Sequence, residues 1–241
     1  MNVLVLAGRR GGEDPVARMA GVTHKAMAPV AGTPMLHRVV ATLRSALPGA
    51  RIVVAIDQPT GFDAVPVGAT PCLTVQGALE GGLVPPLLIT TADHPLLTPA
   101  MVAHFLASIP PGADAAVALA SRQTIMARYP QTRRTWWHFR EIDVSGCNLF
   151  YLGTERASRL VAFWRQLEQD RKRPFAMVRH LGWLTLLRFA LGRLSLAEAL
   201  HRLSLIAGAK AMAVDMPFAE AAIDVDKPDD LALAERLLGG P

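Results

Sequence analysis

The sequence predicts an α/β domain in which helices flank a mostly parallel sheet. Short apolar runs that suit buried strands alternate along the chain with segments that carry helix-start and helix-stop signals. The first run, residues 3–6, ends at Ala7-Gly8, where a buried strand would pass into a loop. Hydrophobic residues make up 51% of the 241 residues and charged residues 19%, which provides a core and argues against a disordered chain.

Local signals delimit each further element. Pro34 lies in the first turn of the first helix, and Pro48 follows the end of that helix. The second strand is stopped by the Asp-Gln-Pro segment at 57–59. Thr98 caps a later helix that has Pro99 at its first position. Strands are expected at residues 3–6, 51–56, 87–91, 115–120, within 142–152, and at 211–214. Helices are expected at residues 34–47, 73–83, 98–108 and 228–238.

Residues 155–207 interrupt this alternation, and we expect them to form a helical insertion within a single domain of residues 1–241. Three consecutive helices are predicted, at residues 155–171, 174–191 and 196–207. The middle helix is apolar nearly all round, which favours burial against the domain or against a second subunit in a homodimer. Its interspersed basic residues leave open an interfacial helix at 174–191 that makes a peripheral membrane contact with anionic lipid.

The overall charge favours anionic partners such as nucleotides, phosphates or acidic lipid surfaces. The formal net charge is +5 and the pI is about 9.8. Cys72 and Cys147 form no CxxC pair, so neither a disulfide scaffold nor a zinc site is expected. The amino-terminal residues do not resemble a signal peptide, and no apolar run is long enough to span a bilayer, so a cytoplasmic protein is expected.

The loop after the first strand carries residues suited to phosphate binding. Gly8, Gly11 and Gly12 would let the backbone N–H groups approach a phosphate, and nearby basic residues would neutralise its charge. In an open α/β sheet, ligands bind beyond the carboxyl ends of the strands, where this loop begins. The spacing is neither GxGxxG nor a Walker A loop, and a basic, glycine-rich surface loop is the alternative interpretation.

This loop and the segment after it resemble the opening of the MobA-like NTP transferases. That family includes the molybdenum cofactor guanylyltransferases and many sugar-phosphate nucleotidylyltransferases. The similar parts are Leu6-Ala7-Gly8 and residues 24–36, which read His-Lys-Ala-Met-Ala-Pro-Val-Ala-Gly-Thr-Pro-Met-Leu. The resemblance implies a Rossmann-like fold of the GT-A type, with a mostly parallel mixed sheet flanked by helices.

The resemblance also implies roles for individual residues. Lys25 would be catalytic, and either Arg10 or Arg18 would bind phosphate, because extra residues separate Gly8 from Arg18-Met19. The residues implied at the nucleotide are Leu6, Ala7, Gly8, Gly11, Gly12 and Thr91.

Two carboxylate segments resemble the family's metal-binding motifs. Asp93 follows a predicted strand and precedes Pro95, and the resemblance makes it the principal Mg²⁺ ligand; an Asp that begins a turn is the alternative. Near the end of the chain, Asp224 and Asp226 alternate in an extended segment and share a face. Asp226 is implied as the second metal ligand and Asp224 as a further one, whereas Asp229 and Asp230 suit the first turn of the last helix.

The acceptor is expected near residues 145–150. The segment that contains Gly146 and Asn148 resembles a Gly-x-Asn strand that lies close to the acceptor in the family. The alternative interpretation is that Asn148 only forms a turn. Arg134, in the Arg133-Arg134-Thr135-Trp136-Trp137 segment, would bind an anionic acceptor; a solvated basic loop beside buried tryptophans is the other interpretation.

These motifs occur in the family's order and predict a magnesium-dependent nucleotidyltransferase. The nucleotide would be CTP or GTP, the acceptor a phosphorylated sugar, polyol or lipid head group, and no nucleic acid partner is expected. A molybdenum cofactor guanylyltransferase is an alternative, against which the insertion and the altered first loop argue. A non-catalytic, nucleotide-binding regulatory protein is another, against which Lys25, Asp93 and Asp226 argue.

Overall fold

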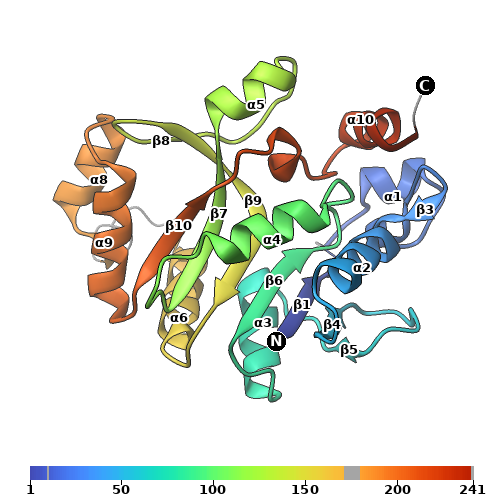
Figure 1. Ribbon diagram of the computed structural model, residues 1–241, viewed down its shortest axis with the longest axis horizontal. Coiled ribbons are helices and arrows are strands. Elements are labelled where there is room, and N and C mark those ends of the chain that lie inside the picture. Colours follow the sequence, from blue (N-terminus) through green and yellow to red (C-terminus); the bar gives the residue numbers. More distant parts are fainter. Residues whose placement is uncertain (10, 171–179, 240–241) are drawn as a thin grey trace.

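An eight-stranded sheet with the order β10-β7-β9-β6-β1-β4-β5 runs through the computed structural model, and β8 pairs with β9 (Figure 1). The structure describes residues 1–9, 11–170 and 180–239. The strands of this sheet are β1 (Asn2–Leu6), β4 (Arg51–Ala55), β5 (Ala64–Val65), β6 (Leu87–Thr91), β7 (Ala115–Ser121), β8 (Trp137–His138), β9 (Asp143–Leu152) and β10 (Ala211–Asp215). A separate two-stranded sheet is formed by β2 (Pro29–Val30) and β3 (Thr33–Pro34).

The sheet is mixed but mostly parallel, as the sequence predicts. β1 pairs in parallel with β4 and β6, and β10 pairs in parallel with β7, whereas β9 runs antiparallel to both β6 and β7. The register places Leu6 opposite Ala55 on one side and opposite Thr91 on the other. The loops that follow β1, β4 and β6 therefore all leave the sheet at the same edge.

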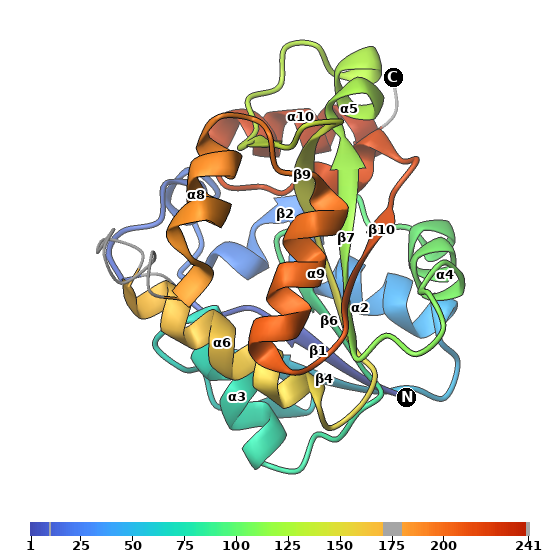
Figure 2. The same cartoon turned by 90° about the vertical axis from the view of Figure 1, so that its left-hand side faces the viewer.

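Helices cover both faces of the sheet. Figure 2 shows α3 (Pro71–Glu80) and α6 (Ala157–Asp170) on one side, with α2 (Met35–Ala46) and α4 (Pro99–Ala107) on the other. The remaining helices are α1 (Pro15–Met19), α5 (Arg122–Arg128), α8 (Trp183–Ala190), α9 (Leu196–Ala207), α10 (Pro228–Gly239) and the short 3₁₀ turns η1 (Lys25–Met27) and η2 (Ala219–Ala222).

Alternation along β1 assigns its side chains to the two layers. Val3 and Val5 pack in the same buried cluster as residues of α2 and α4, while Leu4 packs with residues of α3 and α6. All three are fully buried, as expected for a central parallel strand covered by helices on both faces. This arrangement explains why residues 3–6 read as a continuous apolar run.

Most predicted elements are confirmed within a few residues. Thr98 caps α4 through its side chain, which accepts a hydrogen bond from the Met101 N–H, and Pro99 is the first helical residue. The helix predicted at 73–83 begins earlier, at Pro71, because Thr70 accepts a hydrogen bond from the Leu73 N–H and acts as its N-cap. Helices α1 and α5 are too short to give a periodic signal and were not predicted from the sequence.

The prediction of one continuous helix at 174–191 is wrong, because the chain leaves helical geometry at Gly182. The residue has a φ of 85°, which suits glycine but no helix, and α8 begins only after it. The predicted residues 171 and 174–179 lie outside the described part of the chain. The helices predicted at 155–171 and 196–207 correspond to α6 and α9, and the division of the chain into a domain with an insertion remains a prediction.

Within the described residues, none of the helices combines the length and apolar character that crossing a bilayer requires.

Candidate active site

A cleft of about 660 Å³ opens at the edge of the sheet where β1 and β6 end. Its walls come from four separate parts of the chain: the loop after β1 and the start of η1, the segment that leads into α3, the end of β6, and the loop before α10. The lining residues used below are Leu6, Ala7, Gly8, Arg9, Gly11, Gly12, Arg18, His24, Lys25, Val67, Thr70, Thr91, Asp93, Asp226 and Lys227. All six residues predicted to contact the nucleotide are among them.

The glycine loop approaches the opposite wall closely. A Cβ atom on Gly8 would lie 2.7 Å from Cγ1 of Val67, so a larger residue would force the two walls apart. Gly12 has a φ of 106°, a conformation that L-residues rarely adopt. These two positions therefore require glycine for geometric reasons.

The choice between Arg10 and Arg18 as the phosphate-binding arginine stays open. Arg10 lies outside the described residues. Arg18 is in the last turn of α1, lines the cleft, and remains largely exposed, 3.7 Å from Glu13. Its exposure leaves its side chain accessible to an anionic ligand.

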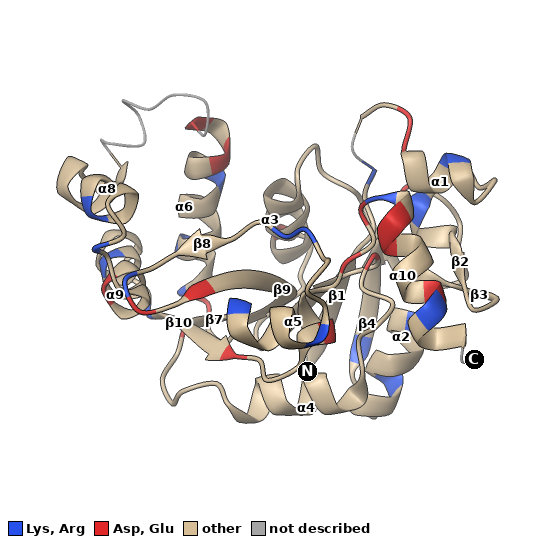
Figure 3. Ribbon diagram, turned by 90° about the horizontal axis from the view of Figure 1, so that it is seen from above, with Lys and Arg blue, Asp and Glu red and all other residues tan. Residues whose placement is uncertain are grey.

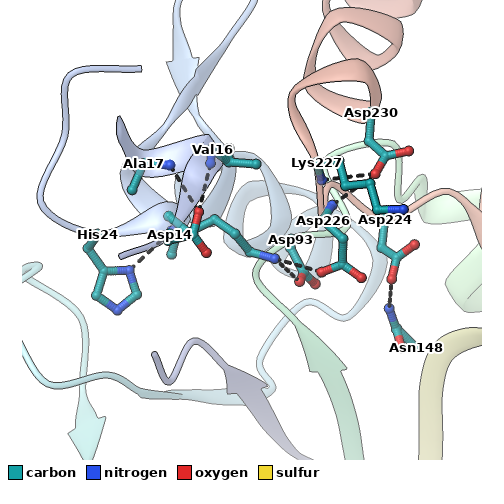
Figure 4. Close-up of polar contacts among 12 residues, drawn as sticks. Asp14, Val16, Ala17, His24, Asp93, Asn148, Asp224, Asp226, Lys227 and Asp230 are labelled. Atoms are coloured by element: carbon teal, nitrogen blue, oxygen red, sulfur yellow. Dashed lines mark hydrogen bonds and ion pairs between the residues drawn. The ribbon is translucent and has the colours of Figure 1, made fainter. Parts of the chain in front are cut away.

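Lys25 joins the two carboxylates that the sequence analysis placed at a common site. Its Nζ donates to Asp93 Oδ2 at 2.7 Å and to Asp226 Oδ1 at 3.0 Å. Figure 4 shows the Asp93 and Asp226 side chains converging from β6 and from the loop before α10. The two residues are 133 positions apart in the sequence and share one cation in the fold.

Backbone contacts explain this meeting. The Val225 N–H donates to the Asp93 carbonyl at 2.8 Å, which fixes the segment around Asp226 beside the end of β6. The Asp230 carboxylate, in the first turn of α10, accepts hydrogen bonds from the Asp226 N–H at 3.2 Å and the Lys227 N–H at 3.0 Å (Figure 4). Asp230 thus has the helix-terminal role that the sequence suggested, and it also shapes the loop that carries Asp226.

The electrostatics at this point favour cations. Burial alone would lower the pKa of Lys25, but the charges and hydrogen bonds of Asp93 and then of Asp226 outweigh it, so the pKa is raised. Lys25 therefore stays protonated at neutral pH. The other carboxylate oxygen of Asp93, Oδ1, is buried and accepts no hydrogen bond from the described residues. An anionic oxygen of this kind can bind a further cation.

These donors fit Mg²⁺, which usually takes one or two protein carboxylates and completes its shell with water and substrate phosphates. Asp93 and Asp226 supply such a pair at the edge of the cleft. Within the described part of the chain, no cluster of three or more His, Cys, Asp or Glu side chains is arranged to enclose a metal.

Asp224 faces away from this pair. Its carboxylate contacts the guanidinium of Arg134, and its Oδ2 accepts a hydrogen bond from Asn148 Nδ2 at 3.3 Å. Burial raises the pKa of Asp224; Arg134 opposes the shift, while the charges of Asp226 and Asp93 add to it. The metal role of Asp224 remains a prediction, and in the structure its carboxylate belongs to an ion-pair network with Arg134.

The Arg134 side chain is a buried member of this network, although the loop that carries it also has exposed residues. Its side chain is 7% exposed and bridges Asp224 to Asp230, with an Nη2–Oδ1 distance of 3.2 Å to Asp230. The neighbouring Arg133 is exposed. The acceptor-binding role predicted for Arg134 remains a prediction.

Asn148 and Gly146 lie where the pairing of β7 with β9 changes register. The register shifts between Val117 and Leu119, and Asn148 has a φ of 50°. This irregularity turns the Asn148 side chain toward Asp224. Gly146 is exposed, and a Cβ atom there would meet nothing within 4 Å, so the strand surface is open at this point.

Sequence reasoning missed a second charged group on the cleft wall. Arg9 forms hydrogen bonds with Asp57 Oδ2 at 2.9 Å and 2.7 Å, and the buried His24 places Nε2 3.3 Å from Asp57 Oδ1. Burial lowers the pKa of His24, with Asp57 opposing the shift. Because Nδ1 accepts from the Ala26 N–H, the neutral ring carries its proton on Nε2, toward Asp57. The sequence feature that could have revealed this group is the position of Asp57, which follows β4, a strand that ends at the same edge as β1 and β6.

The comparisons with known proteins agree with this architecture. A hypothetical transferase from Thermus thermophilus is 34% identical, with a TM-score of 0.83 over 95% of this chain and 98% of that one. The 2-C-methyl-D-erythritol 4-phosphate cytidylyltransferase of Thermus thermophilus is 19% identical, with a TM-score of 0.52 over 98% and 97% of the two chains. CMP:2-keto-3-deoxy-manno-octonic acid synthetase, in a complex with CTP, is 15% identical, with a TM-score of 0.56 over 98% of each chain.

The last two similarities show the shared fold alone. No protein with curated function matches the sequence significantly. The model of the MobA-like NTP transferase domain matches residues 3–212, nearly the whole chain. The chain therefore belongs to the MobA-like NTP transferase family.

Proposed function

We propose that this protein is a magnesium-dependent nucleotidyltransferase. It would transfer the nucleoside monophosphate part of an NTP to a phosphorylated acceptor and release pyrophosphate. The observation that carries the proposal is the placement of Asp93, Asp226 and Lys25 together at the end of a glycine-lined cleft.

The cleft suits a nucleotide in size and lining. Its volume of about 660 Å³ lies within the range of small-molecule pockets, which is roughly 300–1,000 Å³. The glycine loop supplies backbone N–H groups that can approach phosphate oxygens, and Arg18 and Lys25 supply positive charge. CTP and GTP are the proposed nucleotides, and the two distant structural relatives named above both have names that refer to cytidine nucleotides.

Asp93 and Asp226 are the proposed Mg²⁺ ligands. The buried Asp93 Oδ1, which lacks a hydrogen-bond partner in the described structure, supports this assignment. When bound there, Mg²⁺ would act as a Lewis acid and neutralise charge on the phosphate that reacts.

The chain's own residues would mainly position the reactants and stabilise charge. An oxygen of the acceptor phosphate bonds to the α-phosphorus while the bond from that phosphorus to the pyrophosphate oxygen breaks, and pyrophosphate leaves with the electron pair. A phosphate monoester is already anionic at neutral pH, so no side chain need remove a proton. Lys25 would stabilise the negative charge that develops during transfer.

The acceptor is proposed to bind on the β9 side of the cleft. Gly146 leaves the strand surface open there, and Asn148 offers an amide that hydrogen-bonds to Asp224 in its present position. A sugar, polyol or lipid head-group phosphate could be held by Asn148, and Arg134 would act on it only by exchanging its contacts with Asp224 and Asp230 for the acceptor.

A coupled pyrophosphate assay tests the proposal. Each of the four common NTPs is supplied with Mg²⁺ and a panel of phosphorylated acceptors, and we expect release with at least one pair. Asp93→Ala should lower turnover by about 100- to 1000-fold while the protein remains folded. Asp63→Ala, which removes an exposed carboxylate elsewhere, is the matched control and should retain activity.

Other outcomes would identify a different function. Turnover only with GTP and a molybdenum cofactor precursor would indicate a guanylyltransferase. Nucleotide binding with no pyrophosphate release from the NTP, whichever acceptor is supplied, would favour a regulatory protein. Wild-type turnover by Asp93→Ala would contradict the role of this residue.

A further inference from the structure

A carboxylate that follows β4 holds an arginine of the glycine loop at the cleft wall. The Asp57 Oδ2 atom accepts hydrogen bonds from Arg9 Nε at 2.9 Å and from Arg9 Nη2 at 2.7 Å. Arg9 lines the cleft, whereas Asp57 is not among the described residues that do. Neither residue has a role in the reaction proposed above.

The Asp57 carboxylate is itself held in place. Its other oxygen, Oδ1, lies 3.3 Å from Nε2 of His24, a side chain that is only 2% exposed. The His24 ring is oriented in turn, because its Nδ1 accepts a hydrogen bond from the Ala26 N–H at 3.1 Å. The hydrogen bonds from Arg9 lower the pKa of Asp57, so this carboxyl stays ionised at neutral pH. Asp57 is therefore a fixed acceptor to which the long arginine side chain is tied.

Arg9 keeps donors available for a ligand. Its Nη1 donates to the Thr23 carbonyl only at 3.5 Å, and its side chain is 49% exposed. A guanidinium has more N–H donors than these contacts occupy, and its planar fork matches the oxygens of a phosphate. Arg9 also directly follows Gly8, in the loop that is proposed to approach the phosphates.

This pair supplies orientation rather than net charge. Arg9, Arg18 and Lys25 each lie beside a carboxylate, and Figure 3 shows basic and acidic segments next to one another around α1 and the start of α10. In water, repulsion between two unit charges about 6 Å apart changes an affinity by about threefold. Ordering a free arginine side chain costs roughly 10- to 30-fold in affinity. Orientation by Asp57 therefore outweighs its repulsion of a phosphate.

We propose that Asp57 is a positioning residue that acts through Arg9 and sets the guanidinium to bind the phosphates of the NTP. Asp57 itself touches neither the metal nor the nucleotide. The inference rests on the proposed function in taking the cleft as the nucleotide site, and it adds Arg9 to the groups that contact the triphosphate.

Binding measurements test this inference without any turnover. The intact protein is titrated in a calorimeter with CTP, GTP and inorganic tripolyphosphate, each with Mg²⁺. Arg9→Ala should weaken binding by about 10- to 100-fold, because charge-assisted hydrogen bonds are lost. Asp57→Ala should weaken it by about 10-fold, because the arginine is then ordered only when the ligand binds. Both losses should be as large with tripolyphosphate as with the NTP.

Asp57→Asn separates orientation from charge. The amide keeps an oxygen that accepts from Arg9 and removes the negative charge, so this variant should bind within about threefold of the wild type. If charge alone mattered, Asp57→Ala and Asp57→Asn would both bind phosphate more tightly than the wild type. In an Arg9→Ala background, Asp57→Ala should change binding by no more than about twofold, since no arginine is left to position.

Two exposed residues provide matched controls. Arg51→Ala removes an arginine at the opposite end of β4, and Asp63→Ala removes a carboxylate that follows the same strand. Both should leave binding unchanged. Because Arg9 and Asp57 form a largely exposed pair, their variants should melt close to the wild-type temperature.

Several results would overturn the inference. One is unchanged or tighter binding by Asp57→Ala, and another is a loss in Asp57→Ala that persists in full in the Arg9→Ala background. A loss in Arg9→Ala that appears with an NTP but not with tripolyphosphate would assign Arg9 to the base or ribose instead. The expected binding pattern without pyrophosphate release in the coupled assay would support the role of Asp57 and contradict the proposed reaction, whereas a wild type that binds none of the three ligands would overturn both.

Discussion

Lys25 links the two carboxylates on which the proposed chemistry depends. Its position could be anticipated because it lies in a segment, residues 24–36, that resembles a known family. Its contacts could not be anticipated, because the distances to Asp93 and Asp226 depend on how three distant loops pack. The motifs identify the residue types, and only the fold shows that one ammonium group reaches both carboxylates.

Replacing Lys25 by Ala should lower turnover by about 100- to 1000-fold in the pyrophosphate assay, because the charge that develops in the transition state loses its nearest cation. Lys25→Arg should recover part of this loss. Lys210→Ala is a suitable control, since Lys210 is exposed and its Nζ contacts the Pro111 carbonyl far from the cleft. Unchanged turnover in Lys25→Ala would show that phosphate is stabilised by other groups.

Glu198 gives a pH-dependent test of helix α9. It forms a capping box with Ser195, and this spacing can be read directly from the sequence. Hydrogen bonds from the Ser195 N–H and then from Arg188 lower the pKa of Glu198 from 4.5 to about 2. The stabilisation from ionised Glu198 is therefore fully present above pH 4.5 and is lost as the pH falls toward about 2.

Glu198→Gln should therefore be less stable than the wild type at neutral pH, and the difference should shrink as the pH drops below 4.5. Urea unfolding followed across this range measures it. Glu155→Gln, at an exposed position before α6, should show little change at any of these pH values. A constant difference between Glu198→Gln and the wild type would mean that ionisation of Glu198 does not contribute.

At the scale of whole elements, the strands were easier to predict than the irregularities between them. β1 and β6 are short, apolar and bounded by clear turn signals, and β6 has the predicted limits. The register shift in β9 was not predictable, since it depends on pairing with β7 rather than on periodicity, whereas the break at Gly182 has a local signal, the glycine itself, that the helix prediction overlooked. The shift in β9 is nevertheless what brings Asn148 to Asp224.

The loop that carries Arg134 shows how such an irregular segment can stabilise the fold. Removing the buried guanidinium in Arg134→Ala leaves the carboxylates of Asp224 and Asp230 without their cation. The expected loss is about 3–5 kcal/mol in the free energy of unfolding, measured by urea denaturation.

The adjacent Arg133 provides the control for this loss. Arg133 is exposed, and Arg133→Ala should change the free energy of unfolding by no more than about 0.5 kcal/mol. If both variants were equally stable, the Arg134 network would hold the loop without contributing to global stability.

For the whole molecule, parallel topology accounts for what could be predicted about the site. Strands that pair in parallel end at the same edge, so the glycine loop after β1 and Asp93 after β6 had to be neighbours. Asp57 after β4 follows the same rule, although no family motif drew attention to it. The return of residues 224–226 to this edge is different, because it depends on the Val225–Asp93 backbone contact, which no local pattern encodes.

This convergence predicts that nucleotide and metal stabilise the protein together. A ligand that binds the folded state at 100 times its dissociation constant adds about 2.7 kcal/mol, which for a chain of this size raises the melting temperature by roughly 5–10 °C. The rise should require both NTP and Mg²⁺, because Asp93 and Asp226 repel phosphate unless a divalent cation lies between them. Thermal unfolding with NTP plus Mg²⁺, and with NTP plus EDTA, measures the effect. Asp93→Asn should lose most of it while Asp63→Asn keeps it, and an equal rise in EDTA would mean that the nucleotide binds without using these carboxylates.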